Sequence, residues 1–248
     1  MRRWIENRFV RACLTTAVYL LVWQAAAAAV ARPLLLPGPA LTLRRLFTLL
    51  GEPESYAAIA LTLGRVLLGF LLGTAAGVLL GALTGASRFA DALLSPLRGV
   101  VKATPVTSFI LLALLWFSSG MVPVWIALLM VLPVVWAAVL EAVRETDPAL
   151  LEMARAFRLP RRRQIREIYA PSALPPVLAA CSTALGFAWK SGVAAEILAL
   201  PRLAVGSYLY RSKVTLETAD LFAWTLCVIV LSMLLERALV RLMRRIRP

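Results

Sequence analysis

Long apolar segments recur along this 248-residue chain, and they constrain its fold more than any other feature. Crossing the roughly 30 Å hydrocarbon core of a bilayer takes about 20 consecutive, mostly apolar residues in a helix. Six segments meet this requirement, at about residues 10–31, 57–86, 100–117, 121–140, 173–200 and 219–240. We therefore predict an all-α membrane protein with about six transmembrane helices in a single domain that spans residues 1–248.

The composition agrees with a chain whose solvent is mostly lipid. Hydrophobic residues make up 61% of the sequence and charged residues 16%, whereas soluble domains average about 45–50% and 25%. These values exclude a disordered chain and an ordinary soluble enzyme. The first apolar segment begins near basic residues and ends in a small-residue motif at 29–31, as a cleavable signal peptide does. It is longer than a typical signal core, which favours an uncleaved first helix.

Positive charge is unevenly distributed between the two sides of the predicted spans. The chain has 27 Lys and Arg against 13 Asp and Glu, a formal net charge of +14. On a soluble protein that charge would indicate a nucleic-acid partner. Here 19 basic residues fall on one side of the spans, six on the other and two within them. Because cytoplasmic loops are enriched in Lys and Arg, we place both termini and the loop 142–172 in the cytoplasm and expect no nucleic-acid partner.

The residue types present exclude several kinds of chemistry. The sequence has no histidine, and so neither a Ser-His-Asp nucleophile nor a His-ligated zinc site can form. Its three cysteines, Cys13, Cys181 and Cys227, are far apart, which is not the pattern of a disulfide framework or a metal site. The phosphate-binding pattern G-x-x-x-x-G-K-[ST] is also missing. We predict no catalytic residue, no metal and no cofactor bound by this chain.

Glycines recur at every fourth position of the second segment, namely Gly69, Gly73, Gly77, Gly81 and Gly85. Small residues at this spacing let a second transmembrane helix approach closely. We predict that the stripe packs against a neighbouring helix. The alternative is that it clears space for a conduction path.

The loop 142–172 is predicted to contain a short helix with one apolar face. Asp147 and Pro148 form a typical helix start, and Leu159 and Pro160 should end the helix. A second helix should follow over 161–169 and stop at Pro171. The apolar positions of the first helix share one face; they are Leu150, Met153, Ala154 and Phe157. Such a helix could dock a cytosolic partner, or it could lie on the membrane surface, held by the arginines of the loop.

The same loop resembles the EAA loop of permeases in binding-protein-dependent ABC importers, whose pattern is E-A-A, three residues, G, nine residues and I-x-L-P. The matching positions are Glu152, Ala154, Ile168 and Pro171. Met153 and Ala170 depart from the pattern, and Arg158 stands where it has glycine. The resemblance implies a coupling helix that contacts an ATPase through Leu150, Glu152, Met153, Ala154, Phe157, Arg158, Leu159 and Pro160.

Three further segments are similar to the nitrate, sulfonate and taurine branch of these permeases. Residues 36–39 resemble an L-P-S-P element, residues 62–70 a T-L-x-R-V-x-x-G-F signature, and residues 188–196 a W-x-x-x-V-A-A-E segment. The resemblance implies a type I importer permease of the bacterial inner membrane. It further implies a second permease copy, two cytosolic ATPase subunits that bind ATP, and an extracytoplasmic binding protein that delivers the solute.

Three charged residues are expected at membrane depth, in the outer half of the spans or near the midplane: Arg65, Lys190 and Glu196. A lone charge there costs at least a few kcal/mol and needs water or a partner. Either a cation lines an outward vestibule for an anionic solute, or Glu196 forms a structural ion pair with Arg65 or Lys190. The candidate substrate path comprises Arg65, Thr104, Ser108, Trp189, Lys190 and Glu196.

The function that these patterns favour is the permease subunit of an ATP-driven importer for a small anion. The alternative is a secondary transporter with its own ion coupling. That class predicts more intramembrane carboxylates and an inverted repeat, and neither is evident in the sequence.

Overall fold

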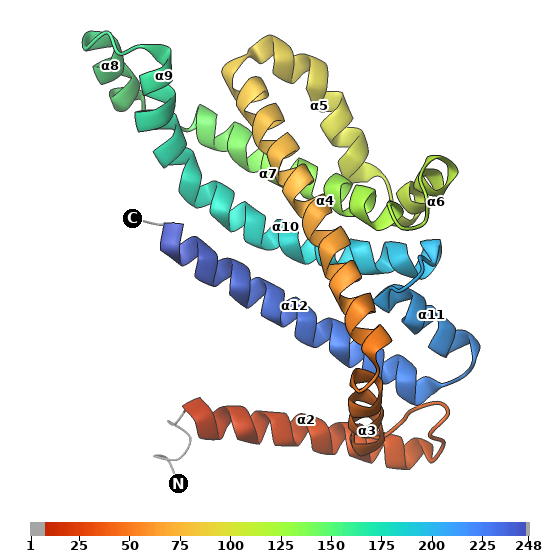
Figure 1. Ribbon diagram of the computed structural model, residues 1–248. Helices are drawn as coiled ribbons and strands as arrows, with labels where there is room; N and C mark the ends of the chain where they lie inside the picture. Colours follow the sequence, from red (N-terminus) through yellow and green to blue (C-terminus); the bar gives the residue numbers. More distant parts are fainter. Residues whose placement is uncertain (1–7, 247–248) are drawn as a thin grey trace.

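The computed structural model describes residues 8–246, and over this range it consists of helices joined by short connections (Figure 1). The helices are α2 (Arg8–Val30), α3 (Pro39–Leu50), α4 (Pro53–Ala86), α5 (Arg88–Ala103), α6 (Val106–Trp116), α7 (Val122–Arg144), α8 (Pro148–Ala156), α9 (Arg161–Gln164), the π-helical segment η1 (Ile165–Tyr169), α10 (Ala170–Ala199), α11 (Val205–Val214) and α12 (Thr218–Ile246). Within this range five helices are long and apolar enough to span a membrane, and α5 with α6 could form a sixth span. The predicted fold class is confirmed. The extreme termini, to which the orientation prediction also refers, lie outside the described residues.

The core of the molecule is built on α7, which packs against α4 on one side and α10 on another (Figure 1). Valines at four-residue spacing, such as Val131 and Val135, put one β-branched face of α7 into this core. Phe70 from α4 and Leu185 from α10 are buried against it. In a bilayer, close packing of this kind is what holds helices together, because lipid removes the hydrophobic drive for association.

The glycine stripe of α4 faces α7. A Cβ atom added at Gly73 would lie 2.7 Å from the carbonyl oxygen of Leu128 and 2.8 Å from Cβ of Val131. The same construction at Gly77, Gly81 and Gly85 gives contacts of 2.9, 2.6 and 2.8 Å with successive valine Cβ atoms of α7, and Gly69 is equally close to the α7 backbone. The two helices therefore approach each other closely over about four turns, with α7 backbone atoms among the near neighbours at Gly69, Gly73, Gly77 and Gly81.

The third predicted span, 100–117, is wrong as a single helix. Helix α5 ends at Ala103 and α6 begins at Val106, with a bend of 104° between them. Pro105 has no N–H to continue the helix, and it forces the preceding Thr104 into an extended conformation with ψ 130°. Helix α5 also begins further upstream, at Arg88, where the Ser87 hydroxyl accepts a hydrogen bond from the Ala90 N–H at 3.2 Å.

The predicted stop at Pro171 is also wrong, because α9, η1 and α10 form one helical run from Arg161 to Ala199. In η1 the backbone hydrogen bonds join residues five positions apart instead of four, so that the Ala170 N–H donates to the carbonyl of Ile165. A widened turn gives the Pro171 ring room where a regular helix would place it against a carbonyl oxygen. The run ends at Leu200, which has left-handed backbone angles.

Helices α2 and α3 are attached to the start of α12. The Trp23 ring stacks on Phe222 at 6.1 Å between centroids, and Arg45 of α3 forms a two-pronged ion pair with Asp220, with Nη2 2.7 Å from Oδ2. No residue of α2 between Cys13 and Val30 is buried. Helix α2 is therefore held near its Val30 end and diverges from α12 toward the other end (Figure 1).

Candidate functional site

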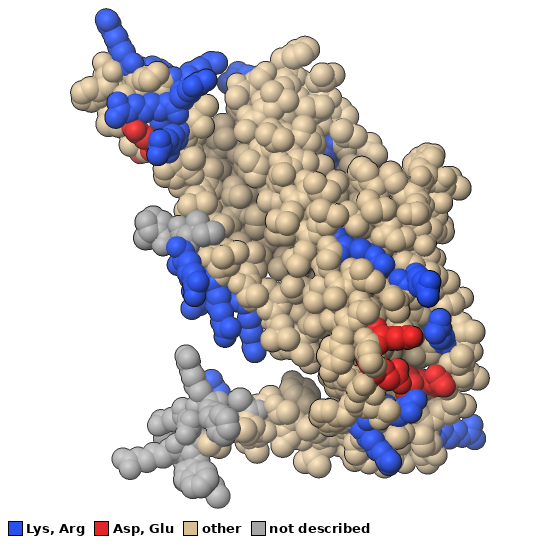
Figure 2. Space-filling model, in the orientation of Figure 1, with Lys and Arg blue, Asp and Glu red and all other residues tan. Residues whose placement is uncertain are grey.

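Helix α8 projects from one end of the molecule, together with α9 (Figure 1). The Asp147 carboxylate accepts a hydrogen bond from the Ala149 N–H at 2.8 Å, and Pro148 occupies the first helical position. These are the cap and start that the sequence predicts. Arginines gather around the same projection (Figure 2).

One side of α8 is an exposed apolar ridge, formed by Leu150, Met153 and Phe157. Their side chains are 37%, 44% and 74% exposed. Ala154 is only 1% exposed and faces the chain itself. Among the other predicted coupling residues, Glu152, Arg158 and Pro160 are exposed and Leu159 is partly buried. The projection thus offers a neighbouring protein three apolar side chains at helical spacing.

Arg158 ends α8 in a conformation that glycine normally adopts, with φ 50°. The Leu159 N–H donates to the carbonyl of Ala154 at 2.9 Å, and the Arg158 N–H donates to that of Arg155 at 3.0 Å. This pair of bonds is a Schellman motif. Arg158, which stands where the EAA pattern has glycine, is therefore in the left-handed conformation that favours glycine.

We expect Arg158→Gly to stabilise the protein by about 1 kcal/mol, because a left-handed conformation costs an L-residue about 1–2 kcal/mol and glycine very little. The measurement is the thermal melting temperature of the purified chain in detergent. Arg155→Gly is the matched control: Arg155 lies within α8, where glycine costs about 1 kcal/mol, and this variant should melt lower. A drop in both variants would contradict the assignment of the turn.

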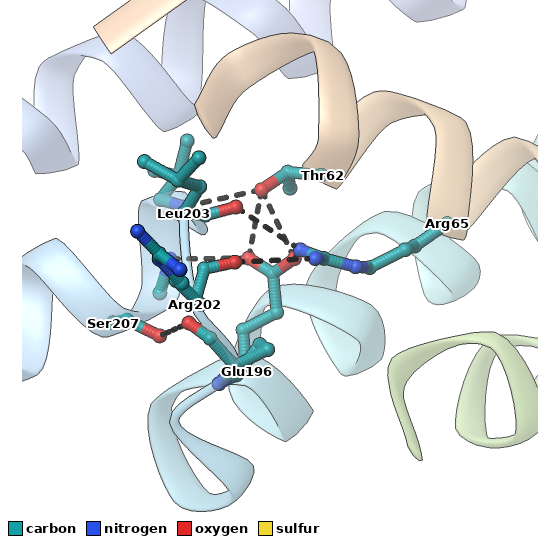
Figure 3. A network of polar contacts seen from close by, with 9 residues as sticks. Thr62, Arg65, Glu196, Arg202, Leu203 and Ser207 are labelled. Atoms are coloured by element: carbon teal, nitrogen blue, oxygen red, sulfur yellow. Dashed lines mark hydrogen bonds and ion pairs between the residues drawn. The ribbon is translucent and has the colours of Figure 1, made fainter. Parts of the chain in front are cut away.

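A second group of polar residues surrounds the carboxylate of Glu196, which is fully buried near the Ala199 end of α10 (Figure 3). The Thr62 hydroxyl contacts its two oxygens at 2.9 and 3.0 Å. The Arg65 guanidinium donates to it at 3.1 Å, and the Gly206 N–H donates at 3.1 Å. We call Thr62, Arg65, Glu196 and Gly206 the outer clamp, after the side of the membrane that the sequence predicts for them.

The outer clamp also holds the short connection between α10 and α11. Arg65 donates to the carbonyl oxygens of Leu203 and Arg202 at 3.3 and 3.4 Å. The Thr62 hydroxyl accepts a bond from the Val205 N–H at 3.1 Å. This connection contains two left-handed residues, Leu200 and Leu203. Helix α4 therefore fixes a strained turn through side chains that lie one helical turn apart.

The other predicted path residues are not brought to the outer clamp. Lys190 is exposed, and no ion pair joins it to a residue in the described range. Its neighbour Trp189 is buried, and the indole N–H donates to the Val228 carbonyl of α12 at 3.2 Å. Thr104 lies in the break between α5 and α6 with its hydroxyl bonded to the Val100 carbonyl at 2.8 Å, and Ser108 is exposed on α6.

Two members of the outer clamp were not among the predicted site residues. Thr62 precedes Arg65 by three positions, which places both on one face of a helix. That spacing could have indicated Thr62 as a neighbour of Arg65 in the site. Gly206 takes part through its backbone N–H alone, so no side-chain pattern marks it. A Cβ atom at Gly206 would lie 2.8 Å from the Ile197 nitrogen, so only glycine lets α11 approach α10 this closely.

An open pocket of about 630 Å³ lies beside the outer clamp, between the start of α4 and α11. Its polar lining residues include Glu54, Arg202, Ser207, Tyr208, Tyr210 and Arg211. The Tyr208 hydroxyl donates to Glu54 at 3.3 Å. Burial, together with the nearby Glu54 carboxylate, raises the pKa of Tyr208. Tyr208 therefore stays protonated at neutral pH and keeps this hydrogen bond.

Comparisons with known proteins agree with this architecture. The family model described as the inner membrane component of binding-protein-dependent transport systems matches residues 69–248. The taurine transport system permease protein TauC of Escherichia coli is 27% identical, over 99% of this chain and 92% of its own length. The putative aliphatic sulfonates transport permease protein SsuC of Bacillus subtilis is 28% identical, over 96% of this chain and 86% of its own length.

A solved structure shares the fold. It is an amino acid ABC transporter chain that superposes with a TM-score of 0.62 at 15% identity, over 78% of this chain and 92% of that chain. The resemblance to the nitrate, sulfonate and taurine branch, inferred from the sequence, is confirmed by these relatives. The chain belongs to the family of inner membrane components of binding-protein-dependent transport systems, and it is a multi-pass transport permease.

Proposed function

We propose that this permease imports a small anionic solute and that a separate ATPase subunit, which binds ATP, drives it through helix α8. The observation that carries the proposal is the exposed ridge of Leu150, Met153 and Phe157 on a projecting helix. Three apolar side chains at helical spacing fit a groove on a partner protein. Burying such side chains contributes about 25 cal/mol per Å² of apolar area.

The distribution of charge supports an orientation with both termini and α8 in the cytoplasm. The arginines around α8 and those at the end of α12 lie toward the same end of the molecule (Figure 2), where the positive-inside rule puts the cytoplasm. The outer clamp and its pocket then face the outside. An extracytoplasmic binding protein would deliver solute to that face. A second permease copy and two ATPase subunits would complete the importer.

The proposed solute is a small anion because the two relatives are named for taurine and aliphatic sulfonates. Within the chain, Lys190 is the cation best placed to attract it, since Arg65 is engaged by Glu196 and Lys190 is exposed on α10. We propose that Lys190 lines the path with Thr104 and Ser108, and that Arg65 and Glu196 support it structurally, whereas the buried Trp189 joins α10 to α12. The Glu196 carboxylate, which a secondary transporter would need for ion coupling, is occupied by its hydrogen bonds.

The double variant Met153→Asp/Phe157→Asp is expected to prevent ATPase binding, because the substitutions place two negative charges in an apolar contact. Affinity of the permease for its ATPase subunit should fall at least tenfold. Both co-purification and ATP-driven uptake in proteoliposomes should then be lost. The control is Leu216→Asp, an exposed leucine in the connection between α11 and α12, where a charge should leave co-purification with the ATPase unchanged. Uptake that persists without any ATPase subunit would overturn the proposed function.

A further inference from the structure

The cytoplasmic end of α12 carries a basic stripe that the transport function does not use. Arg237, Arg241 and Arg244 recur at steps of four and three residues and so share one face of the helix. They surround a hollow of about 380 Å³, which Glu236 and Val240 also line. Figure 2 shows this basic surface on the side of α12 that is turned toward α2.

The three arginines have no anionic partner within residues 8–246. Elsewhere the structure does pair exposed arginines: Arg144 reaches Asp91 at 2.8 Å, and Arg163 reaches Glu167 at 2.9 Å. Glu236 lines the hollow without forming an ion pair with the stripe in that range. Three guanidinium groups held side by side repel each other, and a bound anion would remove that repulsion.

Exposed apolar surface begins directly on the membrane side of the stripe. Met233 and Leu234 lie one turn before Arg237, and Ile229 and Val230 lie one turn further into the span; all four are exposed. At 1.5 Å per residue, the step from Leu234 to Arg237 is about 4.5 Å along the helix axis. Helix α2 faces α12 and adds a second exposed apolar surface. The two helices touch where Trp23 stacks on Phe222, and they diverge from there toward the Arg8 end of α2. A ligand that fits here has an anionic head and an apolar tail.

We propose that the hollow between Arg237, Arg241 and Arg244 binds the phosphate headgroup of an anionic phospholipid from the cytoplasmic leaflet. Guanidinium groups bind phosphate oxygens in pairs, which gives such a site more geometric selectivity than a diffuse positive surface has. The acyl chains lie along the exposed face of α12 toward α2. The proposal rests on the orientation given under the proposed function, because that orientation puts the stripe at the headgroups of the anionic leaflet.

Native mass spectrometry of the purified full chain tests the proposal, with phosphatidylglycerol and phosphatidylcholine of identical acyl chains as probes. The wild type should retain phosphatidylglycerol at least tenfold better than phosphatidylcholine. The triple variant R237Q/R241Q/R244Q should lose this preference. The control R161Q/R162Q/R166Q removes the same charge from the α9 and η1 region and should keep it. Thermal melting of each sample shows that the variants are folded.

Two outcomes would overturn the proposal. In the first, the α12 variant keeps the preference, as it would if a second copy of the chain covered the stripe. In the second, both triple variants lose it equally, which would mean attraction to overall charge rather than to a site. The assay contains neither ATPase nor solute, so its result does not depend on transport. Conversely, retained lipid selectivity with failed uptake would count against the proposed function alone.

Discussion

Gly73→Ala is expected to destabilise the permease by about 1–3 kcal/mol, the usual cost of forcing an extra carbon into a packed core. The added Cβ atom would meet the Leu128 carbonyl oxygen at 2.7 Å and the Val131 Cβ at 2.8 Å. Neither atom belongs to the end of a flexible side chain, so the clash can be relieved only by separating α4 from α7. Gly73→Leu should prevent recovery of a monodisperse protein.

Gly64 provides the matched control in the same helix, because a Cβ atom at Gly64 would have no neighbour within 4 Å. Gly64→Ala should stabilise the protein by up to about 1 kcal/mol, the difference in helix propensity between the two residues. Thermal melting of the full chain in detergent measures both variants. Shifts in the same direction would contradict the packing role of the stripe. A loss of uptake at unchanged melting temperature in Gly73→Ala would favour the conduction-path interpretation instead.

Glu196→Gln is expected to cost about 3 kcal/mol, the lower end of the range for breaking a buried ion pair. The lower end applies because the Arg65 side chain keeps 15% of its surface exposed. The substitution leaves a positive charge without its partner and weakens the bonds from Thr62 and the Gly206 N–H. Thermal melting should fall accordingly, and Lys190→Gln, at an exposed cation in the same helix, should leave it unchanged.

The double variant Arg65→Gln/Glu196→Gln separates a structural pair from a substrate contact. Removing both charges should recover part of the stability, with an interaction free energy of about 0.5–3 kcal/mol in the double-mutant cycle. If Arg65 instead contacts the solute, Arg65→Gln should raise the KM of uptake with little change in melting temperature. Additive losses in the cycle would show that Arg65 and Glu196 act independently.

The elements that the sequence predicts well depend on local pattern. Five of the six apolar segments, the Asp147 cap of α8 and the contact-forming glycines of α4 are each defined by neighbouring residues of one helix. Proline was the least informative signal. Pro105 produces a sharp break, whereas Pro171 lies within a continuous helical run. Whether a helix continues past a proline depends on whether neighbouring turns can rearrange around it.

The outer clamp could be predicted only in part, because it joins residues far apart in the sequence. Thr62 and Glu196 are 134 positions apart, and Glu196 could have paired with Arg65 or Lys190 by depth alone. Which of the two cations pairs with Glu196 depends on how α10 is rotated about its axis. Arg65 points toward Glu196, whereas Lys190 is exposed and turned away from the core. The left-handed turn at Arg158 was likewise hidden, because an arginine there does not indicate positive φ.

The continuous helical run from Arg161 to Ala199 connects the end of the molecule that carries α8 with the end that carries the outer clamp. At 1.5 Å per residue this run is about 58 Å long, with α8 next to one end and the outer clamp at the other. Its Ala199 half is packed against α4 and α7, whereas η1 and three prolines weaken its backbone hydrogen bonds toward the Arg161 end. If α8 binds an ATPase as proposed, we therefore expect the run to bend near its Arg161 end, where the backbone hydrogen bonds are weakest. Because the Ala199 half of the run is packed against α4 and α7, it could tilt only if those two helices moved with it.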